Sequence, residues 1–144
     1  LPAGPLRETK NRLKSVDMII NNGAEAEGEI SSQIEAECYV NLLTNEKKEL
    51  DYFKTKKCLA VSGIGNPKNF HNLLESQGVN LITKVFPDHH TFSKNDITFK
   101  EDYPIIMTAK DCVKCRQFAT SNMWYLSVRA MISADFYQQL ESKL

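Results

Sequence analysis

The stretch CLAVSGIGNPKNFHNLLESQGVNLITKVF (residues 58–86) decides the fold, because it carries the full pattern of a strand, a helix and a second strand. The apolar run 58–63 is short and suits a buried strand. After a glycine-rich turn, Asn66 is placed to cap a helix whose first residue is a proline. Apolar residues then recur at helical spacing and predict one buried face: Phe70, Leu73 and Leu74. Gly78 ends the helix, and the run 79–86 predicts the next strand.

Strands and helices keep alternating along the rest of the chain. Serine or threonine followed three residues later by aspartate predicts helix starts at Ser93 and Thr108, and Ser133 is placed to cap a terminal helix. We also expect a short helix at 7–14, a buried strand at 16–21, a flexible connector at 22–29, and strands at 36–45, 103–108 and 123–128. This alternation predicts an α/β fold with a mainly parallel sheet flanked by helices on both faces, a three-layer Rossmann-like sandwich.

The composition is that of an ordinary soluble globular protein. The 144 residues hold 18 basic and 18 acidic side chains, so no net charge attracts nucleic acid or an acidic membrane. No apolar run approaches the roughly 20 residues that span a bilayer. The four cysteines are too few for a disulfide scaffold and indicate a reducing compartment. Because the chain opens LPAGPLRE without a methionine, we expect it to be part of a larger protein.

The turn GIGNP (residues 63–67) lies between a strand and a helix, where a phosphate-binding turn would lie. It does not match G-x-G-x-x-G, because Lys68 stands at the third glycine position, and no G-K-[ST] follows as in a P-loop. Gly63, Gly65 and Asn66 therefore have two interpretations. We favour a tight turn that needs glycine for its backbone angles; alternatively, its amides and the helix N-terminus receive an anionic part of a substrate.

Two cysteines with C-x-x-C spacing, Cys112 and Cys115, fall in the helix predicted after Thr108. A zinc site would need two more ligands at matching spacing, and Cys38 and Cys58 stand alone. A redox pair would need a thiol with a lowered pKa at the start of a helix. We favour a structural role in which both small side chains pack on the buried helix face.

The sequence VFPDHH (residues 85–90) places an acid and two histidines where the strand at 79–86 ends. Ligands of open α/β sheets bind beyond the carboxyl ends of the strands, so this loop is a candidate site. A metal site would need a third ligand that the sequence does not show, and a plain surface loop stays open as an interpretation. We favour His89 in proton transfer or in orienting a carboxylate. The lone His71 is interpreted as part of the polar face of its helix.

Five ordered motifs resemble one known family: LPAGPLRE (1–8), AVSGIGNPKNF (60–70), FPDHH (86–90), IMTAKDCVKC (106–115) and WYLSV (124–128). Together they resemble the C-terminal half of the tetraacyldisaccharide 4'-kinase family over essentially the whole chain. The resemblance implies ATP-dependent phosphorylation of the 4'-hydroxyl of a tetraacylated, 1-phosphorylated glucosamine disaccharide. It also implies that this lipid A precursor is phosphorylated at the cytoplasmic face of the bacterial inner membrane.

The resemblance also implies a second lobe. The phosphate-binding loop, the magnesium-binding acids and the membrane anchor of the family would precede Leu1. ATP and Mg²⁺ are therefore expected on that N-terminal lobe, with none bound by the motifs of this chain, and the isolated chain is expected to be inactive. The lipid A precursor and, through the complete enzyme, the membrane surface are the other expected partners. A non-catalytic lipid-binding or regulatory module derived from the kinase is the alternative.

Roles carry over from the resemblance by position. His89 resembles the family histidine that pairs with an aspartate of the nucleotide-binding lobe, where a neutral imidazole orients that aspartate as the base. Arg7 and Glu8 resemble active-site residues at the junction between the lobes. Asp88 is expected to anchor or tune His89, and His90 to lie on the surface. Weaker site candidates are Gly63, Gly65, Asn66, Lys110 and Asp111.

Three positions depart from the family pattern. Members usually show Thr-Glu-Lys-Asp at residues 108–111, where this chain has Ala109 in place of the glutamate. They also usually have alanine at the position of Cys112 and proline at the position of Ser127. The cysteine spacing is therefore interpreted as accidental, and the fold is expected to be unaffected. We divide the chain into an inter-lobe junction with the first helix and strand (1–22), a connector with a strand pair (23–57) and a substrate-side α/β domain (58–144). All three are expected to form one domain of a larger two-lobe enzyme.

Overall fold

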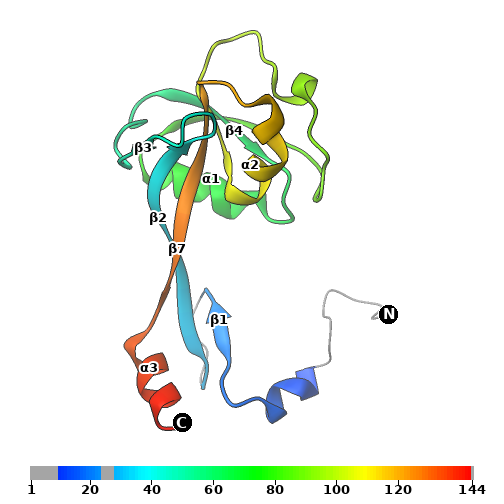
Figure 1. Cartoon of the computed structure of the whole chain (residues 1–144). Coiled ribbons are helices and arrows are strands. Elements are labelled where there is room, and N and C mark those ends of the chain that lie inside the picture. Colours follow the sequence, from blue (N-terminus) through cyan, green and yellow to red (C-terminus); the bar gives the residue numbers. More distant parts are fainter. Residues whose placement is uncertain (1–9, 24–27, 144) are drawn as a thin grey trace. The chain divides into compact units, whose positions relative to one another are not determined.

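The computed structural model describes residues 10–23 and 28–143, and their contacts divide into two compact units (Figure 1). Residues 35–129 form the larger unit, and the described residues before 35 and after 129 form the smaller one. The larger unit holds every described residue of the candidate site.

The predicted strand, helix and strand of residues 58–86 are confirmed. β4 spans Lys57–Ser62, α1 spans Pro67–Ser76 and β5 spans Asn80–Val85. Asn66 takes the N-cap position of α1. Gly78 follows the helix with a φ of 77°, a left-handed conformation that glycine adopts without a steric penalty.

The remaining elements follow the predicted alternation. Before β4 come η1 (Lys10–Ser15), β1 (Ile20–Asn22), β2 (Ile30–Asn41) and β3 (Lys47–Lys48). After β5 come η2 (Lys94–Ile97), β6 (Ile105–Thr108), α2 (Ala109–Cys115), η3 (Arg116–Phe118), β7 (Met123–Ile132) and α3 (Ala134–Glu141). Thr108 caps α2, because its hydroxyl accepts the backbone N–H of Asp111 at 3.2 Å. The helix starts predicted after Ser93, Thr108 and Ser133 are therefore confirmed, the first as a 3-10 helix.

The described strands form one seven-stranded sheet in the order β1, β2, β7, β6, β4, β5, and β3 pairs with β2. β5, β4, β6 and β7 run parallel to one another. β2 lies beside β7 (Figure 1) and runs in the opposite direction, since Glu35 meets Arg129 and Glu37 meets Ser127. The sheet is mixed but mainly parallel, which confirms the predicted α/β class.

Side chains that alternate along the central strands build one core on each face of the sheet. The core under α1 includes Ala60 of β4 and Leu74 of the helix. The core under α2 includes Val61, the next residue of β4, and Cys115. Helices cover both faces, and this layering leaves the strand ends of the sheet open for a site.

The amino-terminal predictions need correction. The strand expected at 16–21 is the short β1. It is an exposed edge strand rather than a buried one, because among the described strands it pairs only with β2. The described part of the helix expected at 7–14 is the 3-10 helix η1. Residues 1–9, and 24–27 of the expected connector, lie outside the described residues.

The strand expected at 36–45 begins earlier, at Ile30, and ends at Asn41 before a turn. In that turn Asn45 has a φ of 59°. Within the described part of the chain, no helix has both the length and the apolar character needed to cross a membrane. The division at residues 22 and 57 stays a prediction.

Truncating Leu74 tests the core under α1. Leu74 is fully buried, so Leu74→Ala is expected to lower the free energy of unfolding by about 2–5 kcal/mol, through lost apolar burial and a residual cavity. Leu43 is exposed, and Leu43→Ala is the matched control, with an expected change below about 0.5 kcal/mol. Chemical denaturation of both variants measures the difference. Equal losses would contradict this packing.

Candidate functional site

The carboxyl ends of β4, β5 and β6 meet at one edge of the sheet, because these strands are parallel neighbours. The segments that leave this edge begin at Gly63 after β4, at Phe86 after β5 and at Ala109 after β6. This is the edge where open α/β sheets bind ligands. The predicted site residues gather here, except Arg7 and Glu8, which lie outside the described residues.

Asp111, in the first turn of α2, is the buried centre of this edge. Its carboxylate accepts hydrogen bonds from the Gly63 backbone N–H at 2.9 Å and from the Thr108 hydroxyl at 2.9 Å. Lys114, three residues further along the helix, places its Nζ 3.0 Å from the other carboxylate oxygen. A buried carboxylate is stable only when partners replace the water it has lost. These three contacts therefore fix the start of α2 to the turn after β4.

Lys110, next to Asp111, reaches the loop that follows β5. Its Nζ lies 3.2 Å from Asp88 Oδ1, and the same oxygen accepts the backbone N–H of His89 at 3.0 Å. The hydrogen bond from Lys110 is the main cause that lowers the pKa of Asp88 below its ordinary value, and His89 contributes less. Asp88 is therefore ionised at neutral pH and links its loop to α2.

His89 lies in the tight turn of this loop, in a backbone conformation that is rare for a residue with a side chain. Its φ is 63°, and the backbone N–H of His90 closes the turn on the carbonyl of Pro87 at 3.1 Å. The His89 side chain is 80% exposed, with its Nε2 3.5 Å from Asp88 Oδ2. Such strain persists only where surrounding contacts impose it. The loop thus presents an imidazole outward from a fixed backbone.

His90 is held against the protein by two aromatic rings. Its ring stacks on Phe86 with centroids 4.6 Å apart and meets Phe92 edge-on at 5.0 Å. Its Nε2 lies 3.3 Å from Asp96 Oδ2, an ion-pair distance without the alignment of a hydrogen bond. The side chain is 26% exposed, so His90 is partly buried rather than fully at the surface as expected. Of the two neighbouring histidines, His89 is the one open to a ligand.

The glycine-rich turn at residues 63–67 passes close to Phe92 and Asp111. A Cβ on Gly63 would lie 3.1 Å from the Phe92 ring and 3.4 Å from the Asp111 carboxylate, so a larger residue would force the ring or the turn to move. Asn66 occupies the N-cap position of α1 without a side-chain capping bond. Neither Gly63 nor Gly65 has a positive φ, so the expectation that this turn needs glycine for its backbone angles is wrong, and at Gly63 the close packing requires glycine instead. Binding of an anion by this turn stays a prediction.

Comparisons with known proteins identify the family. The family model for tetraacyldisaccharide-1-P 4'-kinase matches residues 1–144. The chain belongs to this kinase family. The tetraacyldisaccharide 4'-kinases of Ruthia magnifica subsp. Calyptogena magnifica and Pseudomonas paraeruginosa are 49% and 43% identical to it, and each alignment covers the whole chain. The chain spans just under half the length of these relatives, 46% and 44%.

A solved structure shows the same fold. The crystal structure of LpxK from Aquifex aeolicus in complex with ATP matches 97% of this chain and 46% of its own, with a TM-score of 0.68 and 23% sequence identity. At that identity the match speaks for the fold alone. It agrees with the mainly parallel sheet of this chain.

The C-x-x-C motif of this kinase-family chain serves core packing. Cys112 and Cys115 are both buried in the core under α2. Burial raises the pKa of the Cys112 thiol, and raises the pKa of Cys115 to about 12. A redox pair needs a lowered thiol pKa, so the raised pKa values and the burial of both thiols favour the structural interpretation over the redox one.

Two features of the kinase-family site are absent from the sequence-based predictions. Lys114 is one of them, although its spacing of three from Asp111 on a helix is an available signal. The packing of His90 between two rings is the other, and the sequence gives no sign of it, because Phe86 and Phe92 contact His90 only once the loop has folded. Among residues 10–23 and 28–143, no three His, Cys, Asp or Glu side chains are placed to hold a metal ion.

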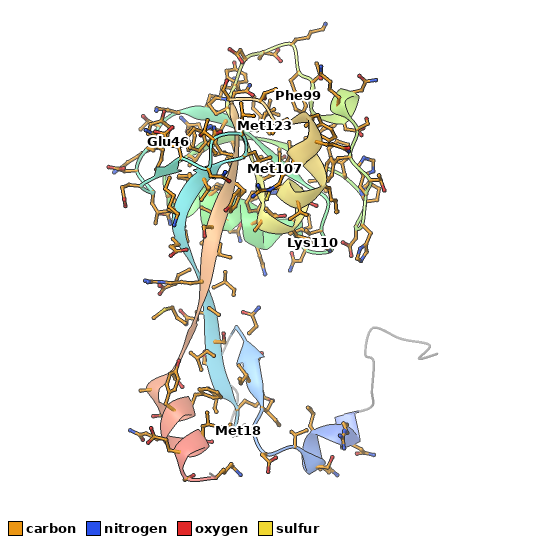
Figure 2. All side chains as sticks on the ribbon, in the orientation of Figure 1. Met18, Glu46, Phe99, Met107, Lys110 and Met123 are labelled. Carbon is orange, nitrogen blue, oxygen red and sulfur yellow. The ribbon has the colours of Figure 1, made fainter. Side chains whose placement is uncertain are left out.

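A cavity of about 460 Å³ lies at the opposite end of the larger unit. Its lining includes Phe99 and the first residues of β6 and β7, Ile105 and Met123. Figure 2 shows Phe99 and Met123 at that end and Lys110 on α2 at the other. The candidate site of this kinase-family chain is therefore an open strand-end surface and not this cavity.

Replacing Asp111 tests the buried carboxylate. Asp111→Asn puts an amide NH₂ where donors converge and leaves Lys114 without its counter-charge, so the free energy of unfolding is expected to fall by about 3 kcal/mol or more. Asp51 is exposed, and Asp51→Asn is the control, with an expected change within about 0.5 kcal/mol. Thermal and chemical unfolding measure both. If Asp111→Asn left the free energy of unfolding unchanged, the carboxylate would not be what holds the start of α2 to the turn after β4.

Thiol alkylation tests the structural role of the cysteines. Because the pKa values of Cys58 and Cys115 are raised to about 11 and about 12, their thiolate forms are scarce at pH 8. Both are expected to react with iodoacetamide at least about 100-fold more slowly than the same cysteines in the unfolded chain. Mass spectrometry of native and denatured samples gives the rates. Fast native alkylation of Cys112 or Cys115 would revive the redox interpretation.

Proposed function

We propose that this chain is the C-terminal part of a tetraacyldisaccharide 4'-kinase. The complete enzyme transfers the γ-phosphate of ATP to the 4'-hydroxyl of a tetraacyl disaccharide 1-phosphate, the lipid A precursor, at the cytoplasmic face of the inner membrane. The family match over residues 1–144 and the names of the relatives support this reaction. The activity is proposed for the complete protein, because the chain spans just under half the length of those relatives.

No MgATP site is proposed on this chain. The 144 residues contain no G-x-x-x-x-G-K-[ST] loop, and the described part offers no cluster of three side chains for a metal ion. ATP and Mg²⁺ are therefore assigned to a partner lobe, and no step is assigned to the metal here. The Aquifex LpxK structure is a complex with ATP, which supports nucleotide binding by a complete enzyme of this fold.

The observation that carries the proposal is an exposed His89 on a fixed backbone at the carboxyl edge of the sheet. In the closed enzyme its imidazole would orient an aspartate of the partner lobe, which accepts the proton of the sugar hydroxyl as the phosphoryl group is transferred. Phosphoryl transfer depends chiefly on positioning and electrostatics, which suits a residue presented from a second lobe. Arg7 and Glu8 are proposed to act at the junction between the lobes.

Steady-state kinetics of the complete enzyme tests His89. His89→Ala is expected to lower kcat by roughly 100-fold or more, the scale of a positioned acid–base group. The KM for ATP should change little, because the nucleotide is assigned to the other lobe. The fold should survive, since the side chain is exposed on a loop.

His90→Ala is the matched control. It removes a ring that packs on Phe86 and Phe92, so it should lower stability while leaving kcat within about threefold once the protein is folded. Circular dichroism confirms folding of both variants. A strongly lowered kcat for His90→Ala, or an unchanged kcat for both variants, would overturn the assignment of His89.

A further inference from the structure

We propose that Lys110 is a positioning residue for His89 and acts through Asp88. The inference rests on the proposed function, because it concerns the orientation of the histidine assigned there. Lys110 has no direct contact with the imidazole among the described interactions. Its effect on His89 passes through one carboxylate.

That carboxylate contacts both the backbone and the ring of His89. Asp88 Oδ1 accepts the His89 backbone N–H at 3.0 Å, which supports the left-handed φ of 63°. Asp88 Oδ2 lies 3.5 Å from Nε2 of the His89 ring. If the carboxylate rotates or moves, the contacts that it makes with the backbone and with the ring of His89 are lost together.

Lys110 holds the carboxylate from the side of α2. Its Nζ lies 3.2 Å from Oδ1, the oxygen that also accepts the His89 N–H. On the other side Oδ2 lies next to Gly65, since a Cβ built there would stand 3.5 Å from that oxygen, an ordinary van der Waals distance. Asp88 is thus placed between the first turn of α2 and the turn before α1.

Lys110 extends from a rigid base. Its neighbour Asp111 is fully buried and bonded to Gly63, Thr108 and Lys114, so the backbone that carries Lys110 is fixed. The Lys110–Asp88 pair itself is about half exposed. Exposed ion pairs contribute little to stability, so loss of Lys110 should disturb orientation without unfolding the protein.

A double-mutant cycle in the complete enzyme tests the proposal. Lys110→Gln is expected to lower kcat roughly 10-fold, because a small displacement of a reacting group costs about that much or more. The KM values for ATP and for the lipid acceptor should stay within about twofold, and Lys110→Arg should restore most of kcat. In an Asp88→Asn background, Lys110→Gln should lower kcat by less than about twofold, since the route through Asp88 is already broken.

Lys94→Gln is the matched control: Lys94 is an exposed lysine of η2, and its replacement should leave kcat unchanged. The proposal is overturned if Lys110→Gln raises the KM for the acceptor at constant kcat, which would make Lys110 a substrate contact. It is also overturned if Lys110→Gln costs as much in the Asp88→Asn background as alone, or if its loss of kcat follows a loss of melting temperature. A wild-type enzyme without kinase activity would overturn the proposed function itself.

Discussion

The candidate site depends on one buried ion, the carboxylate of Asp111. Its three partners come from three places: Gly63 from the turn after β4, Thr108 from the end of β6, and Lys114 from the next turn of α2. Taking a carboxylate out of water costs several kcal/mol, which is offset only while the partners stay in place. The ends of β4 and β6 and the start of α2 therefore cannot shift independently of one another.

Asp111 also helps to hold the loop after β5, which carries His89. Consecutive residues of an α-helix point about 100° apart, so Asp111 can face the interior while Lys110 faces the loop after β5. The pair with Asp88 then ties that loop to α2. Held through Asp88, His89 keeps a strained backbone and an exposed ring. Positioning a group before it reacts is what phosphoryl transfer requires.

Sequence patterns that span a few residues predicted the local structure, but they could not predict contacts between residues far apart in the chain. The unit at 58–86 was predictable because glycine, proline and apolar spacing act within a few residues. The capping pair Thr108 and Asp111 was visible, but the bond from Asp111 to Gly63 joins residues 48 apart. The apolar run at 16–21 resembled a buried strand, and only the sheet order shows it to be an edge. Burial of His90 likewise depends on how its loop folds back.

The site also shows why Ala109 is compatible with this arrangement, although the resemblance to the family implies a glutamate there. Ala109 is exposed and is the first residue of α2, directly after the capping Thr108. A glutamate at that position would favour the helix N-terminus by about 0.3–1 kcal/mol. Adjacent helix residues do not face one another, so it would not compete for Lys110 from the neighbouring position. The substitution therefore weakens the start of α2 slightly and leaves the pair between Lys110 and Asp88, and the bonds of Asp111, in place.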